Sequence, residues 1–239
     1  MIARLILLAA ILALGVTGAS AAALRVMPIS IERVAPAAAA SLTLSDGGTE
    51  PINVQVRVFR WRQGPGGDIL EPTRDVIVSP PILKLVPGTD YTVRVVRVAK
   101  TAIKGEEAYR ILADELPTRA PATEDSITLL LRYSIPVFFA AAGAAAPSVV
   151  WSVASSDGHL LVRATNRGAA RLRISQLSIG TKEKTHTLVG GLAGYVLGGS
   201  TMTWSIPAPA TAPTSGAATL SFDTDKGKVD VPVVIKPGA

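Results

Sequence analysis

Residues 126–139, SITLLLRYSIPVFF, decide the fold class of this 239-residue chain. A β-strand turns alternate side chains to opposite faces of its sheet. Every odd position of the segment is apolar, so one face of such a strand is hydrophobic throughout, whereas the even positions are mixed. A strand this long and apolar needs a large partner surface, and at a sheet edge its open backbone groups can pair with another chain. The odd residues are Ile127, Leu129, Leu131, Tyr133, Ile135, Val137 and Phe139.

The same two-residue period recurs along most of the chain. It is clearest in residues 53–61 (NVQVRVFRW) and 91–98 (YTVRVVRV). Segments rich in Gly and Pro separate these runs, such as residues 63–68 (QGPGGD) and 87–90 (PGTD). No segment shows the length and 3.6-residue period of a long helix. The sequence therefore predicts an all-β protein built from β-sandwiches.

The sharpest change of composition divides the chain into two domains. Residues 140–147 (AAAGAAAP) are typical of a linker, because a glycine and a proline there oppose a helix. Strand-like runs resume after it, so we expect one domain over residues 22–141 and a second over residues 142–239. In the second domain, residues 190–200 (GGLAGYVLGGS) are predicted to form a loop and residues 223–227 (DTDKG) a hairpin turn.

The first residues resemble a secretory signal peptide. Arg4 precedes an apolar run over residues 5–16, and residues 19–21 (ASA) fit the small-residue pattern of a cleavage site. The apolar run, about 12 residues, is short of the roughly 20 that span a bilayer. We therefore expect residues 1–21 to be removed on export to a bacterial periplasm, and no later segment to insert into a membrane.

Composition argues against several classes of site. The chain has no cysteine, which excludes thiol catalysis and cysteine-based metal sites. Its net charge of +6 is modest and its Lys and Arg residues are scattered, so nucleic acid is not an expected partner. Glu106 and Glu107 cannot act as paired catalytic acids in a strand, because adjacent residues point to opposite faces. With no recognisable catalytic motif, we expect neither enzymatic activity nor a metal or cofactor.

The order of motifs resembles the PapD-like periplasmic chaperones of fimbrial (pilus) chaperone–usher assembly. The most specific motif is GEEAYRILADELP at residues 105–117, and the weaker SPP at residues 79–81 precedes it as in that family. The ending RYSIPVFF at residues 132–139 looks like the divergent, archaic branch. The residues that match the family motif are Glu107, Tyr109, Arg110, Glu115 and Pro117.

The resemblance implies two immunoglobulin-like domains in an L or boomerang arrangement. It also implies donor-strand complementation, in which the chaperone lends an edge strand to a pilus subunit that lacks one and then delivers it to an outer-membrane usher. Carried onto this sequence, the donor residues are Ile127, Leu129 and Leu131, while Thr128 and Leu130 face the chaperone's own core. In the alternative that stays open, the odd residues fill that core instead.

The sequence departs from the family where the subunit is anchored. Well-studied members grip the C-terminal carboxylate of the subunit with an Arg on the first strand and a Lys on the seventh. This sequence has Ser30 and Pro136 there, and neither can form a charge-assisted bond. We therefore expect a relocated anchor and rank Arg132 first, because it adjoins the donor segment. The other candidates are Arg33, Arg94 and Arg97.

A second departure concerns an ion-pair network between the domains. The resemblance implies such a network around Glu107, but its expected Arg partner falls near Ala140. We expect a different cation to substitute and a carboxylate of the second domain to complete the network. The candidates are Arg110 or Arg132 with Asp223 or Asp225.

Other classes of function stay open at this point. A secreted two-domain β-sandwich that binds carbohydrate or a surface protein would need an exposed aromatic cluster, whereas Trp61, Trp151 and Trp204 are spread over both domains. A structural pilus component would carry its own donor extension, and an exported hydrolase would need a nucleophile–base pair. The expected partners are therefore pilus subunits and the usher. Whether the free chaperone also self-associates to cover its apolar edge stays open.

Overall fold

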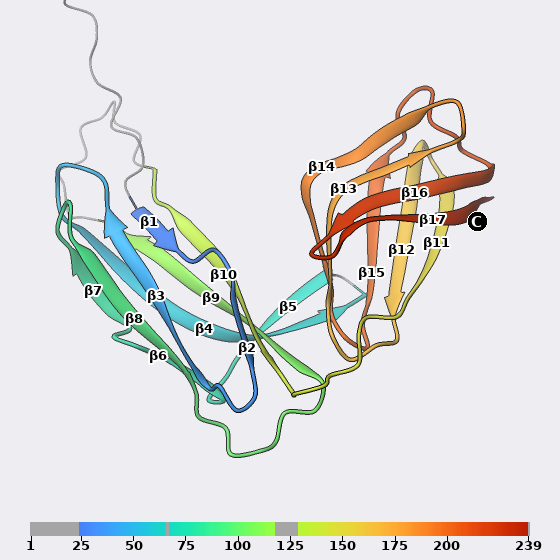
Figure 1. The fold of residues 1–239 in the computed structure, drawn as a ribbon. Helices are drawn as coiled ribbons and strands as arrows, with labels where there is room; N and C mark the ends of the chain where they lie inside the picture. Colours follow the sequence, from blue (N-terminus) through green and yellow to red (C-terminus); the bar gives the residue numbers. More distant parts are fainter. Residues whose placement is uncertain (1–23, 66, 118–128, 239) are drawn as a thin grey trace, which may run out of the picture.

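The computed structural model describes residues 24–65, 67–117 and 129–238. They form two β-sandwich domains that meet at an angle, which confirms the predicted all-β, two-domain architecture (Figure 1). Within these ranges no helix is long and apolar enough to cross a bilayer. The expected signal peptide, residues 1–21, lies outside the described residues, as do Ile127 and Thr128.

Two sheets form the first domain. Their strand orders are β1-β3-β8-β6 and β2-β10-β9-β4-β5, and β7 also pairs with β4. The strands of the first sheet are β1 (Leu24–Met27), β3 (Ala39–Asp46), β8 (Asp90–Arg97) and β6 (Val76–Ser79). Those of the second are β2 (Ile31–Val34), β10 (Arg132–Ala140), β9 (Glu106–Leu116), β4 (Ile52–Gly64), β5 (Gly67–Pro72) and β7 (Ile82–Leu85).

Alternation along the strands builds the core of the first domain. On β10 the odd residues Ile135, Val137 and Phe139 are buried in the core between the two sheets, as the two-residue period predicts. The even residues Pro136 and Phe138 are buried as well. Phe138 belongs to a separate apolar cluster that includes residues of the second domain, so both faces of the last part of β10 are covered.

One continuous sheet path folds into the second sandwich, in the order β14-β13-β16-β17-β11-β12-β15. Its core holds inward-facing residues such as Leu160, Ile174 and Phe222. Trp151 and Trp204 stack with ring centroids 6.4 Å apart and pack against that core. The strands are β11 (Val149–Ser156), β12 (His159–Asn166), β13 (Leu172–Gly180), β14 (Thr185–Val196), β15 (Thr201–Pro207), β16 (Gly216–Thr224) and β17 (Gly227–Pro237).

The predicted loop at residues 190–200 is wrong over residues 190–196, because β14 continues to Val196. The register between β13 and β14 shifts at three places, so the strand absorbs extra residues as bulges without ending. Gly191 and Gly194 have φ angles of 69° and 134°, which glycine adopts without steric cost. The hairpin turn at residues 223–227 is confirmed by the pairing of Thr224 with Gly227.

Aromatic side chains dominate the junction between the domains. Trp61 and Phe138 of the first domain meet Tyr195 of the second, with ring centroids 5.5 to 5.8 Å apart. Ala108 and Leu197 complete this buried cluster. Trp61 is thus an aromatic residue of the domain interface.

The ion pair between the domains forms at Glu106, so the prediction of Glu107 is wrong by one residue. The Glu106 carboxylate accepts a hydrogen bond from the backbone N–H of Arg171, 3.0 Å away, and pairs with the Arg171 guanidinium. Glu107 stays within the first domain, where its carboxylate accepts from Arg97 at 2.8 Å. Adjacent strand residues point to opposite faces, which separates the two carboxylates.

None of the four proposed substitutes joins this network. Arg110 lies 3.7 Å from Asp68, and Arg132 pairs with Asp114, so both cations stay with carboxylates of the first domain. In the second domain, Asp225 accepts from Arg173 at 3.4 Å, and the Asp223 carbonyl accepts from Ser175.

Candidate functional site

The strand β10 is covered along only part of one edge. On its other side it pairs antiparallel with β9 over its whole length, from Arg132 to Ala140. On the partly covered edge, β2 pairs with β10 in parallel. Only residues 137–140 of β10 are paired there, with residues 31–34 of β2. Residues 132–136 have no strand partner there within the described ranges. Unpaired backbone groups at a sheet edge can accept another strand, so we define these five residues as the open edge.

Exposed apolar side chains lie in the segments next to the open edge. Leu129, three residues before β10, is 78% exposed. Met27, the last residue of β1, is 70% exposed, and Ile29, in the segment that leads into β2, is 81% exposed. The parallel register of β2 with β10, extended back by two residues, brings Ile29 beside Ile135. Sequence reasoning missed Met27 and Ile29, because their run alternates only weakly and the pairing of β2 with β10 is not local.

The predicted donor residues differ in their exposure to solvent. Leu129 is exposed, whereas Leu131 is half-buried and packs against the core of the first domain. Leu130 is 45% exposed, so the expectation that it faces the core is wrong. From Leu131 onward the odd residues follow the alternative in which they fill the chaperone-like domain's own core, and only Leu129 among the described donor residues is free to contact a partner.

Arg132, the first-ranked anchor, is already paired. It and Arg57 both donate to the Asp114 carboxylate, whose side chain is only 10% exposed. Burial alone would raise the pKa of Asp114, but the hydrogen bonds from Arg132 and Arg57 outweigh burial and hold that pKa below its usual range. A partner's carboxylate would therefore have to compete with Asp114 for Arg132.

Arg97 is a structural residue of the first domain. Its guanidinium is 8% exposed and donates twice to Glu107, at 2.8 and 2.9 Å. It also donates to the carbonyls of Ala99 and Thr101. With these four hydrogen bonds it has little capacity left for an external carboxylate.

Arg33 and Arg94 lie together on another part of the first domain. They line a groove of about 590 Å³ with Ala39 and Ser41. Arg33 donates to the Ala39 carbonyl at 3.0 Å, while Arg94 is exposed on β8. Arg33 comes from β2, in the sheet of the open edge, whereas Arg94 and Ser41 come from β8 and β3 of the other sheet, so the groove lies where the two sheets meet.

Arg110 is the cation that sequence reasoning did not consider as an anchor. In the register of β9 with β10 it stands opposite Pro136, the last residue of the open edge. Its guanidinium stacks 3.8 Å above the Trp61 ring and lies 5.9 Å from the Tyr195 ring. The side chain is 16% exposed, and burial lowers its pKa. Its nearest carboxylate among the described residues, Asp68, is 3.7 Å away and half-exposed, so the pair is loose.

With this geometry in place, comparison with known families is decisive. The family described as "Pili and flagellar-assembly chaperone, PapD N-terminal domain" matches residues 24–144, more than half of the chain. The chain belongs to this family of pilus-assembly chaperones.

Solved structures share the fold of this chaperone. One is the pre-assembly complex of the chaperone CsuC with the tip adhesion subunit CsuE, from the archaic Csu pili of Acinetobacter baumannii. Its matching chain has 24% identity and a TM-score of 0.67, over 91% of this chain and 100% of that one. A second is the SafA–SafB pilin–chaperone complex of Salmonella enterica, with 17% identity and a TM-score of 0.58, over 88% of this chain and 94% of that one. A third is the CupB2 chaperone of Pseudomonas aeruginosa, with 15% identity and a TM-score of 0.56, over 87% of this chain and 98% of that one. No curated protein matches the sequence.

Four of the five motif residues of the chaperone lie on β9, the strand that pairs with β10. Tyr109 is fully buried; its hydroxyl donates to Glu107 at 3.0 Å and accepts from Arg60 at 2.7 Å. Burial raises the pKa of the Tyr109 phenol to about 12. Glu115 exchanges two hydrogen bonds with Leu131: its N–H donates to the Leu131 carbonyl at 2.9 Å, and its carboxylate accepts the Leu131 N–H at 3.3 Å. Pro117 follows the end of β9.

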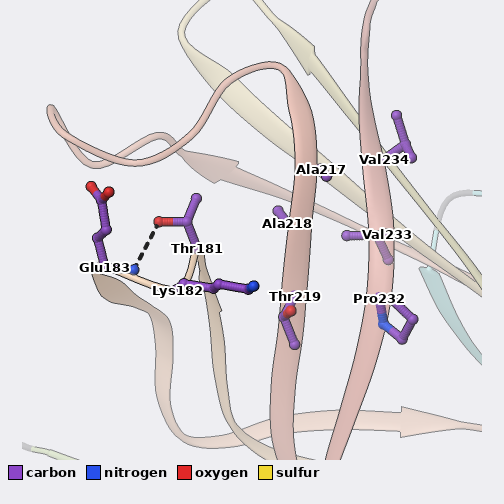
Figure 2. Close-up of a pocket in the computed structure, with 9 residues that line it drawn as sticks. All are labelled: Thr181, Lys182, Glu183, Ala217, Ala218, Thr219, Pro232, Val233 and Val234. Carbon is purple, nitrogen blue, oxygen red and sulfur yellow. Dashed lines mark hydrogen bonds between the residues drawn. The ribbon is translucent and has the colours of Figure 1, made fainter.

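A groove of about 680 Å³ on the second domain contains none of the predicted site residues. It lies between the β13–β14 turn and the strands β16 and β17 (Figure 2). The Lys182 side chain reaches toward Thr219 on β16, while the Glu183 carboxylate points away from that strand. The described part of the chain contains no group of three or more His or acidic side chains placed to hold a metal ion.

Proposed function

We propose that this chaperone captures pilus subunits at the open edge of β10 by donor-strand complementation and delivers them to an outer-membrane usher. The observation that carries the proposal is the unpaired stretch over residues 132–136, flanked by the exposed Leu129, in a chain of the pilus-chaperone family. An incoming strand can bond to that backbone while apolar side chains enter the subunit's groove. Of the predicted donor residues Ile127, Leu129 and Leu131, we assign the partner contact to Leu129, because Leu131 packs against the first core and Ile127 lies outside the described residues.

The proposed cellular location and domain boundaries rest on the sequence. We propose that residues 1–21 direct export to the periplasm, that residues 22–141 form the domain with the donor strand, and that residues 142–239 form the second domain. Complexes of relatives support subunits as partners, since the similar chains come from a chaperone–tip subunit complex and a pilin–chaperone complex.

We further propose that Arg110 anchors the subunit's C-terminal carboxylate. It combines a planar guanidinium, which suits carboxylates, with a loose pairing to Asp68 and a position at the end of the open edge. Arg132 is second, because Asp114 already neutralises it. Arg33 and Arg94 are third, and Arg97 is committed to Glu107.

Co-expression in a bacterial periplasm with pilus subunits encoded beside its gene tests the proposal. We expect a stable one-to-one complex that is lost with Leu129→Asp, at an unchanged midpoint of thermal unfolding. The matched control is Leu192→Asp, which alters another exposed leucine, on the second domain. Retention of the complex with Leu129→Asp, or its equal loss with Leu192→Asp, would count against the donor edge.

The carbohydrate-binding alternative has less support. Trp61 is buried at the domain junction, and Trp151 and Trp204 pack against the second core, so the tryptophans do not form an exposed platform. Self-association of the free chaperone through the same open edge remains a proposal. It predicts a mass that rises with concentration and falls to that of one chain with Leu129→Asp.

A further inference from the structure

A side-chain amide at the domain junction takes the place of a neighbouring strand. Gln63, near the end of β4, donates from Nε2 to the Tyr195 carbonyl at 2.9 Å. Its Oε1 accepts from the backbone N–H of Leu197, also at 2.9 Å. A residue of a neighbouring parallel strand binds a carbonyl and the N–H two residues later with the same two kinds of bond. Gln63 therefore binds the end of β14 as one residue of an added strand would.

A second two-point contact lies on the next strand of the same sheet. Glu106, at the start of β9, binds both the backbone N–H and the guanidinium of Arg171, directly before β13. That guanidinium also pairs with Glu32 on β2 and lies 3.6 Å above the Phe138 ring. Arg171 is thus held by residues of three strands of the first domain.

The contacts spread over the width of the sheet. Gln63, Glu106 and Phe138 come from β4, β9 and β10, which are successive neighbours. Their partners come from the ends of β13 and β14, which pair with each other. Contacts at several separated points oppose rotation about any single axis, unlike one point of contact.

Without directional bonds, this junction would constrain the relative orientation of the two domains only weakly. Its buried apolar cluster has five residues, two of them from the second domain. Small interfaces between domains of one chain ordinarily permit relative motion. Hydrogen bonds depend on distance and angle, so Gln63 and Glu106 add the orientation that apolar contact alone does not supply.

We infer that Gln63 is a positioning residue: with the Glu106–Arg171 pair it makes the two domains one rigid body and sets the orientation of the second domain relative to the open edge. By fixing the backbone of Tyr195, it also keeps that ring against Arg110. The rigid-body part rests on the junction alone; only the link to subunit capture rests on the proposed function.

Interdomain distances in the free chaperone test the inference. The chain has no cysteine, so Lys84→Cys and Lys228→Cys, one exposed site in each domain, give two unique spin-label positions. Pulsed electron paramagnetic resonance should give one narrow distance distribution. With Gln63→Ala we expect its width to grow roughly twofold, as for domains joined by a small interface. Gln55→Ala, on the same strand away from the junction, should leave the width unchanged.

A second variant separates the hydrogen bonds from general destabilisation. Gln63→Glu keeps an acceptor for the Leu197 N–H but places a carboxylate against the Tyr195 carbonyl, so it should also widen the distribution. Each variant's far-ultraviolet circular dichroism and thermal unfolding are recorded alongside. A distribution that stays narrow in both Gln63 variants, or widens equally with Gln55→Ala, would overturn the inference. No subunit is present, so this result is independent of whether the proposed function holds.

Discussion

Pro136 on β10 stands directly opposite Arg110 on β9 in the antiparallel register of the two strands. A proline at the end of the open edge has no N–H to offer and no charge, while the arginine across from it is held between Trp61 and Tyr195. At this end of the open edge, a cation therefore stands on the neighbouring strand β9 and not on β10 itself.

Arg110→Ala should weaken subunit binding by roughly 10- to 100-fold, the range for losing hydrogen bonds to a charged group. Arg110→Lys keeps the charge but loses the planar fork and should recover only part of the affinity. Titration calorimetry or surface capture with a purified subunit measures both. Arg94→Ala is the matched control on the other sheet; if it weakens binding as much as Arg110→Ala, the assignment of the anchor is wrong.

Leu131→Asp should differ from Leu129→Asp in its effect on the free chaperone. Leu131 packs against the first core, so an aspartate there should lower the free energy of unfolding by about 1–3 kcal/mol. The exposed Leu129 should tolerate the change within about 0.5 kcal/mol. Urea denaturation measures the free energy of unfolding of both variants. Equal stability of the two would contradict the different burial of the two leucines.

The Tyr109 phenol should ionise only at high pH. Its pKa is raised to about 12, so the neutral phenol stabilises the fold fully below the unfolded value of about 10. That stabilisation is lost as the pH rises through 12. Absorbance near 295 nm should show one late-ionising tyrosine that disappears in Tyr109→Phe. The assignment fails if the late step persists in that variant.

Glu107 should make the fold sensitive to acid. Its pKa is below the usual range because burial, which would raise it, is outweighed by hydrogen bonds from Arg97 and Tyr109. The carboxylate therefore stabilises the fold above the unfolded pKa of about 4.3, and this is lost as the pH falls through the lower folded value. Glu107→Gln should cost about 3 kcal/mol at pH 7, because Arg97 is left buried and unpaired.

Denaturant unfolding at pH 7 and pH 3 measures this dependence. The stability of Glu107→Gln should fall less between the two pH values than that of the native chain. Glu50→Gln, at an exposed position, should follow the native chain at both. An unchanged pH dependence in Glu107→Gln would show that other carboxylates control the acid transition.

The sequence supported the fold class because strand periodicity is local. Alternation in residues 126–139 predicted one apolar face, and Ile135, Val137 and Phe139 of that face are buried in the first core. The predicted loop at residues 190–200 failed since glycines in a bulged strand and in a loop have the same composition, and only pairing with β13 distinguishes them.

Site residues were harder to predict because they depend on register between strands. Choosing Glu107 over Glu106 as the interdomain carboxylate needs the face of β9, which a one-residue shift reverses. Arg110 stood out only as a motif residue, since its position opposite Pro136 comes from strand pairing. Gln63 carried no signal at all: a single polar residue near a turn does not reveal that its amide will bind another domain.

The short strand β2 also limits how far another strand can pair along β10. It occupies the side of β10 from residue 137 onward, so a guest strand lying along residues 132–136 has nowhere further to extend. A polypeptide that adds to this edge must end, or turn away, at about the level of Pro136. The position of β2 would thereby fix where a guest strand stops pairing, and additional residues at that end of a subunit would have to leave the plane of the sheet.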